Sequence, residues 1–315
     1  MKKEKKHIKV ILSRKGFDSS NGGFPSLILP EKDKDGFRKM ISLPIPCCSK
    51  CCNYEKCKSY KYSNDTRLYN MMSNLYNGKG KKRNTIKIKK NNKIVDEILL
   101  SEATHCHLDP CLGNYSIKEL EKVGIFGQHG RAATELKDVR KDDIFIFFGL
   151  FNDVAVKDDK YIIKNKENGG RHVMFGYLQA GKIIDNNKYY IEYEKHPHFC
   201  CCKIKNNNII YIARKRLKID SKELDVAGYG MFKYDSKLDL TQQKPDKTYW
   251  NSTRWSCDNL PTCLKDLIVP RLKYECKDNY FQSAPMGQEF VIEDNKEVEK
   301  WAIELIKKHS VNRIK

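Results

Sequence analysis

Two residues of the H-L-D-P stretch, His107 and Asp109, have the types and the spacing to do chemistry. In an extended chain, residues two apart point to the same side, so the imidazole and the carboxylate would face the same space. A histidine and a carboxylate placed in this way form half of a two-histidine, one-carboxylate iron site, which would need a distant His196 or His198. The same pair suits acid–base catalysis or substrate binding. It also suits a structural hydrogen bond in the turn before Pro110, and the spacing does not choose among the three.

A second candidate is the polar stretch 13–23, which follows the short apolar run 10–12. Successive backbone N–H groups in a glycine-rich loop can form a concavity that binds an anion. Arg14 and Lys15 add positive charge at the end of the apolar run. The glycine spacing matches neither a Walker loop nor a dinucleotide fingerprint. The stretch therefore predicts either a phosphate-binding loop or an ordinary loop rich in glycine, serine and asparagine.

The chain has 13 cysteines, and Cys48, Cys51 and Cys57 are the candidate metal ligands, zinc or iron being the cofactors considered. Cys48 and Cys51 form a C-x2-C pair, but zinc needs four ligands and a second such pair is missing. The alternative is an insertion with free thiols. An odd number excludes a complete intramolecular disulfide framework, and without an export signal we expect thiols or metal ligands rather than disulfides. The residues that could complete a metal site are Cys57, Cys106, Cys111, Cys200, Cys201 and Cys202.

The formal net charge of +20 favours a polyanionic partner, and we expect DNA or a nucleotide. Lysine and asparagine are abundant throughout, so a compositional bias without a binding groove is the alternative. One basic cluster stands above this background, namely Lys79, Lys81, Lys82, Arg83, Lys87, Lys89 and Lys90.

No membrane partner is expected from the sequence. The longest apolar runs, such as Ile144–Phe151, are far too short to span a bilayer. The N-terminal segment Met1–His7 is charged and lacks the long apolar stretch of a signal peptide. We therefore expect a soluble protein of the cytoplasm.

The elements that would position these residues are mostly strands. Residues 142–214 form a series of apolar runs separated by polar turns, which predicts consecutive antiparallel strands. Apolar residues from Val298 to Ile306 recur at helical spacing, which predicts an amphipathic C-terminal helix. We expect an α+β fold, mainly an antiparallel sheet or barrel with peripheral helices, over one domain, 1–315. Residues 47–95, rich in cysteine and lysine, are expected to be an insertion within it.

The strand pattern of residues 142–184 is similar to that of PUA-like barrels, which bind RNA or modified bases in DNA. The chain as a whole also resembles a known family, the nucleotide-modification-associated domain family, third type. The resemblance covers nearly the whole chain but not the cysteine cluster at 47–63. It rests on the strings S-R-K-G-F-D-S-S-N-G-G (13–23), P-S-L-I-L-P (25–30), I-S-L-P-I-P (41–46), H-L-D-P (107–110), F-G-Q-H-G (126–130), D-D-I-F-I-F-F-G (142–149), H-V-M-F-G-Y-L-Q (172–179), H-P-H (196–198) and G-Q-E-F-V (287–291).

The resemblance implies a setting, DNA or nucleotide modification, and no particular reaction. Because the matching polar residues come from separate loops, we expect them to form one composite pocket. In it, the first loop would hold a phosphate and the glutamines would read a base edge. The residues expected to be catalytic are His107, Asp109 and Asp18. Those expected to bind substrate are Arg14, Lys15, Gly16, Ser19, Ser20, Gly22, Gly23, Gln128, Gln179, His198 and Glu289.

Four functions are compatible with these patterns. The first is an enzyme that acts on a base or nucleotide, and the second is a non-catalytic reader of modified nucleic acid with a PUA-like barrel. The third is a metal-dependent protein that uses His107, Asp109 and a distal histidine. The fourth is a basic globular protein of unrelated role.

Overall fold

The computed structural model describes eighteen stretches of the chain. They are residues 7–16, 25–47, 60–61, 67–77, 85–90, 93–99, 105–113, 123–158, 160–164, 169–185, 193, 195–199, 207–241, 249–250, 275–277, 280–282, 289–292 and 294–311.

The main sheet has ten strands. Its path follows the order β19-β1-β9-β11-β12-β8, and the other four strands attach beside this path. The strands are β1 Val10–Arg14, β2 Ser26–Lys32, β3 Arg38–Ile41, β8 Ile125–His129, β9 Ile144–Lys157, β10 Lys160–Ile163, β11 Arg171–Asp185, β12 Asn208–Ala213, β15 Tyr229–Met231 and β19 Glu289–Ile292.

The remaining elements are short sheets and helices around it. The smaller sheets pair β4 Ile45–Cys47 with β7 His105–His107, β5 Thr85–Lys90 with β6 Lys93–Leu99, β13 Arg216–Ile219 with β14 Lys222–Ala227, and β18 Tyr280–Gln282 with both β16 Tyr249–Trp250 and β17 Glu275–Lys277. The helices are α1 Leu68–Asn77, α2 Arg131–Glu135, α5 Lys296–His309 and the 3-10 helices η5 Pro197–Phe199 and η6 Ser236–Leu238.

The two long strands β9 and β11 form the centre of the sheet because their sequences are almost continuously apolar. Residues 144–151 are buried on both faces of the sheet, as a central strand requires. The first half of β9 pairs in parallel with β1, and its continuation pairs in parallel with β2. Strand β11 pairs antiparallel with β9 and, after a bulge near Ala180, with β12.

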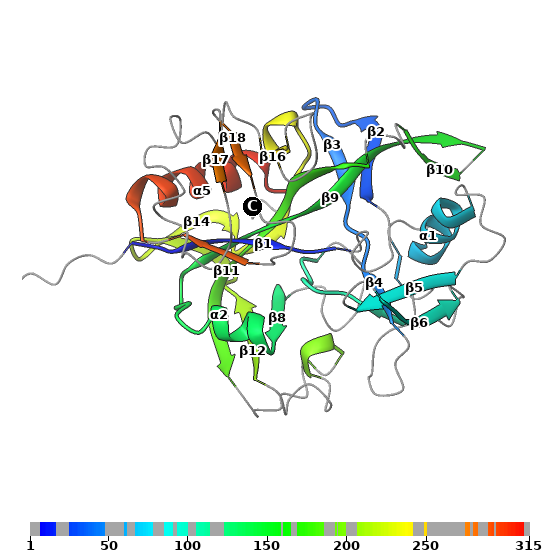
Figure 1. Ribbon diagram of the computed structural model, residues 1–315. Coiled ribbons are helices and arrows are strands. Elements are labelled where there is room, and N and C mark those ends of the chain that lie inside the picture. The colour runs from blue at the N-terminus through cyan, green and yellow to red at the C-terminus, as the bar shows by residue number, and fades with distance from the viewer. Residues whose placement is uncertain are drawn as a thin grey trace, which may run out of the picture.

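The sheet curls into a half-barrel, which brings β8 at one end of the path towards β9 and β1 (Figure 1). Three strand steps separate β8 from β9, a distance of about 14 Å in a flat sheet. Yet the ring centroid of Phe126 on β8 lies 4.9 Å from that of Phe145 and 5.1 Å from that of Phe147. Tyr211 of β12 packs 4.7 Å from Phe145. Aromatic rings therefore fill the inside of the half-barrel.

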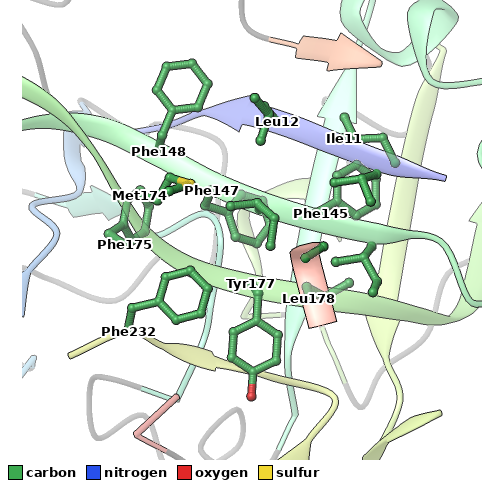
Figure 2. Packing of buried hydrophobic residues seen from close by; sticks show 14 of the residues in the cluster. Ile11, Leu12, Phe145, Phe147, Phe148, Met174, Phe175, Tyr177, Leu178 and Phe232 are labelled. Carbon is green, nitrogen blue, oxygen red and sulfur yellow. The ribbon is translucent and has the colours of Figure 1, made fainter. Parts of the chain in front are cut away.

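Residues alternate between the two faces along each strand, so a different set of side chains lies on the outer face of the half-barrel. Figure 2 shows the buried side chains of this region, among them Phe148, Leu12 and Tyr177, which stacks on Phe232. Phe148 packs edge-on against Trp250 at 5.4 Å. The hydroxyl group of Tyr177 lies 2.8 Å from the hydroxyl of Ser310, the residue that caps the end of α5. Helix α5 therefore lies on the outer face.

Most of the expected elements are present. The fold is strand-rich and mainly antiparallel, and helices are few among the described residues. Helix α5, which begins at Lys296 with Asn295 as its cap, is the expected amphipathic C-terminal helix. The parallel pairing of β1 with β9 differs from the expectation, because the distant first strand inserts beside the meander. Likeness to PUA barrels, a single domain and an insertion at 47–95 stay predictions. Among the described residues, no helix is long and apolar enough to cross a membrane.

Candidate functional site

The two ends of the curled sheet meet at a polar seam, which we call the seam site and define by Ser13, Lys15, Gln128 and Glu289. Strand β8 and strand β19 are the two ends of the path, five strand steps or about 24 Å apart in a flat sheet. In the half-barrel, the side-chain amide of Gln128 on β8 donates a hydrogen bond to Oε1 of Glu289 on β19. This bond links the edges that the main sheet leaves open.

Lys15 brings a positive charge to the same carboxylate. Its Nζ lies 3.2 Å from Oε1 of Glu289, and the side chain of Glu289 is completely buried. Ser13 pairs directly with Glu289 across the β1–β19 ladder, so the two side chains share one face of the sheet. The Lys15 amine also lies 4.5 Å from the ring centroid of Phe126. The seam site thus lies directly above the aromatic interior.

Two buried oxygen atoms of the seam site have unused hydrogen-bonding capacity. Ser13 Oγ and Glu289 Oε2 have no hydrogen-bond partner among the described residues. Buried polar atoms in folded proteins are nearly always hydrogen-bonded, so such atoms call for an explanation. A ligand that donates a hydrogen bond to Glu289 Oε2 and accepts one from the hydroxyl of Ser13 would explain both.

Asp109 occupies the free edge of β8, next to the seam. Cys111 bridges to Ile125 at this edge, and two residues earlier the carboxylate Oδ1 of Asp109 accepts a hydrogen bond of 3.0 Å from the backbone N–H of Gly127. The carboxylate of Asp109 therefore accepts a hydrogen bond from the backbone N–H of β8 that lies just beyond the bridge between Cys111 and Ile125. The next residue of β8, Gln128, points into the seam, so the two contacts fix both sides of this strand.

Histidines surround Asp109, and we call His107, His129, His196 and His198 the histidine cluster. The Nε2 atoms of His196 and His198 lie 3.3 Å and 3.6 Å from the two carboxylate oxygens. His107 packs edge-on against His198, with ring centroids 5.4 Å apart. The structure thus brings together the H-L-D-P and H-P-H stretches, as the sequence predicts.

The electrostatics of Asp109 reflect this environment. Burial would raise the pKa of Asp109, but hydrogen bonding and charge from His196 and His198 outweigh it and hold the pKa well below the ordinary value. Asp109 is therefore an anion at neutral pH. His198 is fixed further by Asn208, whose side-chain oxygen lies 2.9 Å from Nδ1 and whose amide donates to the His198 carbonyl at 2.8 Å.

The geometry of the histidine cluster does not form a metal site within the described part of the chain. No group of three histidine, cysteine, aspartate or glutamate side chains there is arranged to hold an ion. Both imidazoles direct Nε2 at the carboxylate itself. A cavity of about 10 Å³ lies beside Asp109 and is lined also by His107 and by Gly16 at the end of β1.

Two described cysteines near Asp109, Cys106 and Cys111, differ in state. Cys106 is disulfide-bonded, which differs from the expectation of reduced thiols and metal ligands. Cys111 is a free, buried thiol, and burial with the nearby charge of Asp109 raises its pKa to about 12, so it stays protonated at neutral pH. The candidate metal ligands Cys48, Cys51 and Cys57 lie outside the described residues.

Two expected substrate-binding residues lie away from the seam site. Gln179 on β11 is fully buried and pairs with Ile144, the first residue of β9. Its side-chain nitrogen donates to the carbonyl oxygens of Asp142 and Lys218, and its side-chain oxygen accepts from the N–H of Lys218. Arg14 is the neighbour of Lys15 in an extended segment, so it points to the other face of the sheet. The expected residues Asp18, Ser19, Ser20, Gly22 and Gly23 lie outside the described residues.

Sequence reasoning missed Ser13 and Asn208. A signal for Ser13 was available, because it lies two residues before Lys15 in a strand and so shares its face. Asn208 gives no such signal, because nothing in the local sequence pattern indicates its contact with His198.

The fold and site together define a class: a β-rich protein whose curled sheet carries a buried, charged polar site at its open seam. The chain belongs to the family of nucleotide modification associated domain 3, whose model matches residues 9–293. Comparison with the curated proteins and with the solved structures gave no match. The role that the family name gives is association with nucleotide modification.

Proposed function

We propose that the seam site binds a nucleobase, of a nucleotide or of DNA, and that the modification-associated role of the family is carried out there. The observation that carries the proposal is the pair of buried oxygens, Ser13 Oγ and Glu289 Oε2, that lack a hydrogen-bond partner among the described residues. Ser13 pairs with Glu289 across the ladder, and the amine of Lys15 contacts the other carboxylate oxygen of Glu289, so the site offers acceptors, a hydroxyl donor and a positive charge.

These groups match the edge of a base. A carboxylate oxygen accepts an N–H of an exocyclic amino group, as Glu and Asp do with cytosine. The hydroxyl of Ser13 can donate to a ring nitrogen or a carbonyl oxygen. Gln128 holds the other carboxylate oxygen, so Glu289 presents Oε2 in a fixed direction. In an enzyme, Glu289 would also accept the proton of the N–H that it binds, with Lys15 stabilising negative charge on the base.

The excess of positive charge supports a nucleic-acid substrate over a neutral metabolite. A formal net charge of +20 attracts polyanions at long range. The basic cluster from Lys79 to Lys90 remains a candidate for contact with the phosphate backbone.

A non-catalytic reader is the second candidate, and the histidine cluster favours it. His198 directs one ring nitrogen at Asp109 and the other at Asn208, so both are engaged within the fold. Asp109 is engaged by the backbone of Gly127. The His–Asp pairing that could have supplied acid–base chemistry thus has a structural role in this reading, and the seam site would recognise a base without changing it.

One experiment separates these functions. Nucleosides of DNA from cells that express the wild type, Glu289→Gln or an exposed control, Glu297→Gln, are quantified by mass spectrometry. An altered nucleoside with the wild type and the control, but not with Glu289→Gln, identifies an enzyme. With unaltered DNA, binding of oligonucleotides carrying modified bases is measured on the purified proteins. Binding that Glu289→Gln weakens identifies a reader, and a variant equal to the wild type in both assays refutes the seam site.

A further inference from the structure

A second cavity, of about 490 Å³, lies between the β2–β3 hairpin and β15, where the chain leaves α5. Its volume is in the range of small-molecule sites in proteins. None of the four residues of the seam site lines it. We call it the hairpin cavity.

The floor of the hairpin cavity is apolar and adaptable. It is formed by buried side chains, among them two methionines and a phenylalanine ring. Methionine fits flat or irregular apolar ligands because its side chain is flexible and its sulfur is polarizable. The floor residues are Leu29, Met40, Ile41, Leu112, Met231 and Phe232.

The rim carries surplus positive charge. Four cations line the cavity against two carboxylates, Glu31 and Asp33, and one of the four, Arg38, is ion-paired with Asp153. Lys233 lies 2.7 Å from Asp33 and is largely neutralised by it. Lys32 and Lys39 are exposed on the rim. Desolvation lowers the pKa of Lys39, so a bound anion would stabilise its charged form.

We propose that the hairpin cavity binds a nucleoside monophosphate unit, with the base on the apolar floor and the phosphate at Lys32 and Lys39. A flat apolar body that carries an anion is what the floor and rim together recognise. The choice of a nucleotide among such ligands rests on the proposed function, but the site is a separate one.

Position strengthens the proposal. Met231 lines both the hairpin cavity and the small cavity beside Asp109. A nucleotide in the hairpin cavity would therefore lie one side chain away from the histidine cluster.

The test is calorimetric titration of the full chain with the four 2′-deoxynucleoside 5′-monophosphates, the matching nucleosides, inorganic phosphate and a short single-stranded oligonucleotide. Lys39→Glu reverses a rim charge, with exposed Lys222→Glu on β14 as its control. Val311→Trp places a large ring at the mouth, where Val311 is 51 % exposed, with Val156→Trp, 45 % exposed on β9, as its control.

We expect monophosphates to bind more tightly than nucleosides or phosphate, and both cavity variants to weaken this binding at least tenfold while both controls stay within twofold. If the oligonucleotide binds and both cavity variants weaken that binding too, the ligand is a nucleotide unit within a strand. If only the monophosphates bind, the ligand is the free nucleotide. Equal binding of phosphate, or binding insensitive to both cavity variants, overturns the proposal. Loss of binding in Lys39→Glu and Val311→Trp assigns the nucleotide to the hairpin cavity. Loss of binding in Glu289→Gln, with both cavity variants equal to the wild type, assigns it to the seam site instead and overturns the proposal.

Discussion

Replacing Gly127 by alanine tests whether β8 is fixed as the structure has it. A Cβ atom at Gly127 would lie 2.3 Å from Cγ of His198, and ordinary contacts begin at 3.4 Å. His198 would thus have to move by about 1.1 Å, the difference between these distances. His198 is only 2 % exposed, and its ring is hydrogen-bonded to Asn208. Gly127→Ala should therefore destabilise the protein strongly for so small a change.

The magnitude follows from two contributions. Inserting a methyl group into a well-packed interior costs about 1–3 kcal/mol. Moving His198 by an ångström lengthens or breaks its two hydrogen bonds with Asn208, each worth about 0.5–1.5 kcal/mol. Because the movement can relieve part of the clash, the two costs overlap, and we expect a loss of about 2–4 kcal/mol in the free energy of unfolding.

Urea unfolding followed by circular dichroism measures this loss, provided that the transition is two-state. A double-mutant cycle is the control: His198→Gly removes both the ring and the Cβ atom that would lie 2.6 Å from the added methyl group. Adding Gly127→Ala to His198→Gly should therefore cost at least about 1 kcal/mol less than adding it to the wild type. Strictly additive effects, or a single variant within 0.5 kcal/mol of the wild type, would refute the packing of Gly127 against His198.

Three further predictions concern other positions. The pKa of Asp109 is lowered in the folded state, so its contribution to stability is complete above pH ~4 and is lost as the pH falls further. Asp109→Asn should therefore make the free energy of unfolding, measured by urea titration, fall less steeply below pH ~4. An unchanged dependence on pH would contradict this prediction. Gln179→Leu leaves buried backbone groups unpaired and should cost at least ~2 kcal/mol, measured as a shift of the urea midpoint, without weakening nucleotide binding by the folded protein. Arg171→Lys loses the fork that contacts Asp153, Asp239 and Tyr234 and should cost about 1–3 kcal/mol; equal midpoints would show that one amine suffices.

The strands were predictable because their periodicity is strong. The acidic turn before Ile144 and the run to Phe151 predict a buried strand, and β9 begins at Ile144. The apolar face of α5 was equally clear, with Val298, Ala302, Leu305 and Ile306 buried. The parallel pairing of β1 with β9 was not predictable, because more than 130 residues separate them and a local pattern carries no information on such a partner.

The site was only partly predictable, for a related reason. The sequence indicated Lys15, Gln128 and Glu289 as polar residues of one pocket, and the curl of the sheet does bring them together. The sequence did not indicate that the side chain of Gln179 would be hydrogen-bonded to backbone groups. A buried glutamine that links two segments of backbone and a glutamine that binds a base have the same local sequence pattern. Only the hydrogen-bond partners distinguish the two.

Strand β8 connects the histidine cluster with the seam site. Its edge N–H at Gly127 holds Asp109, and its next side chain, Gln128, holds Glu289. In the proposed function, the histidine cluster would therefore position the seam site through β8 without touching a ligand there. If that is its role, Asp109→Asn should weaken ligand binding at the seam, and removing the contact of Gln128 with Glu289 as well should add little. Independent, additive losses would instead mean that Asp109 contacts the ligand itself, which would restore the acid–base role of the H-L-D-P stretch.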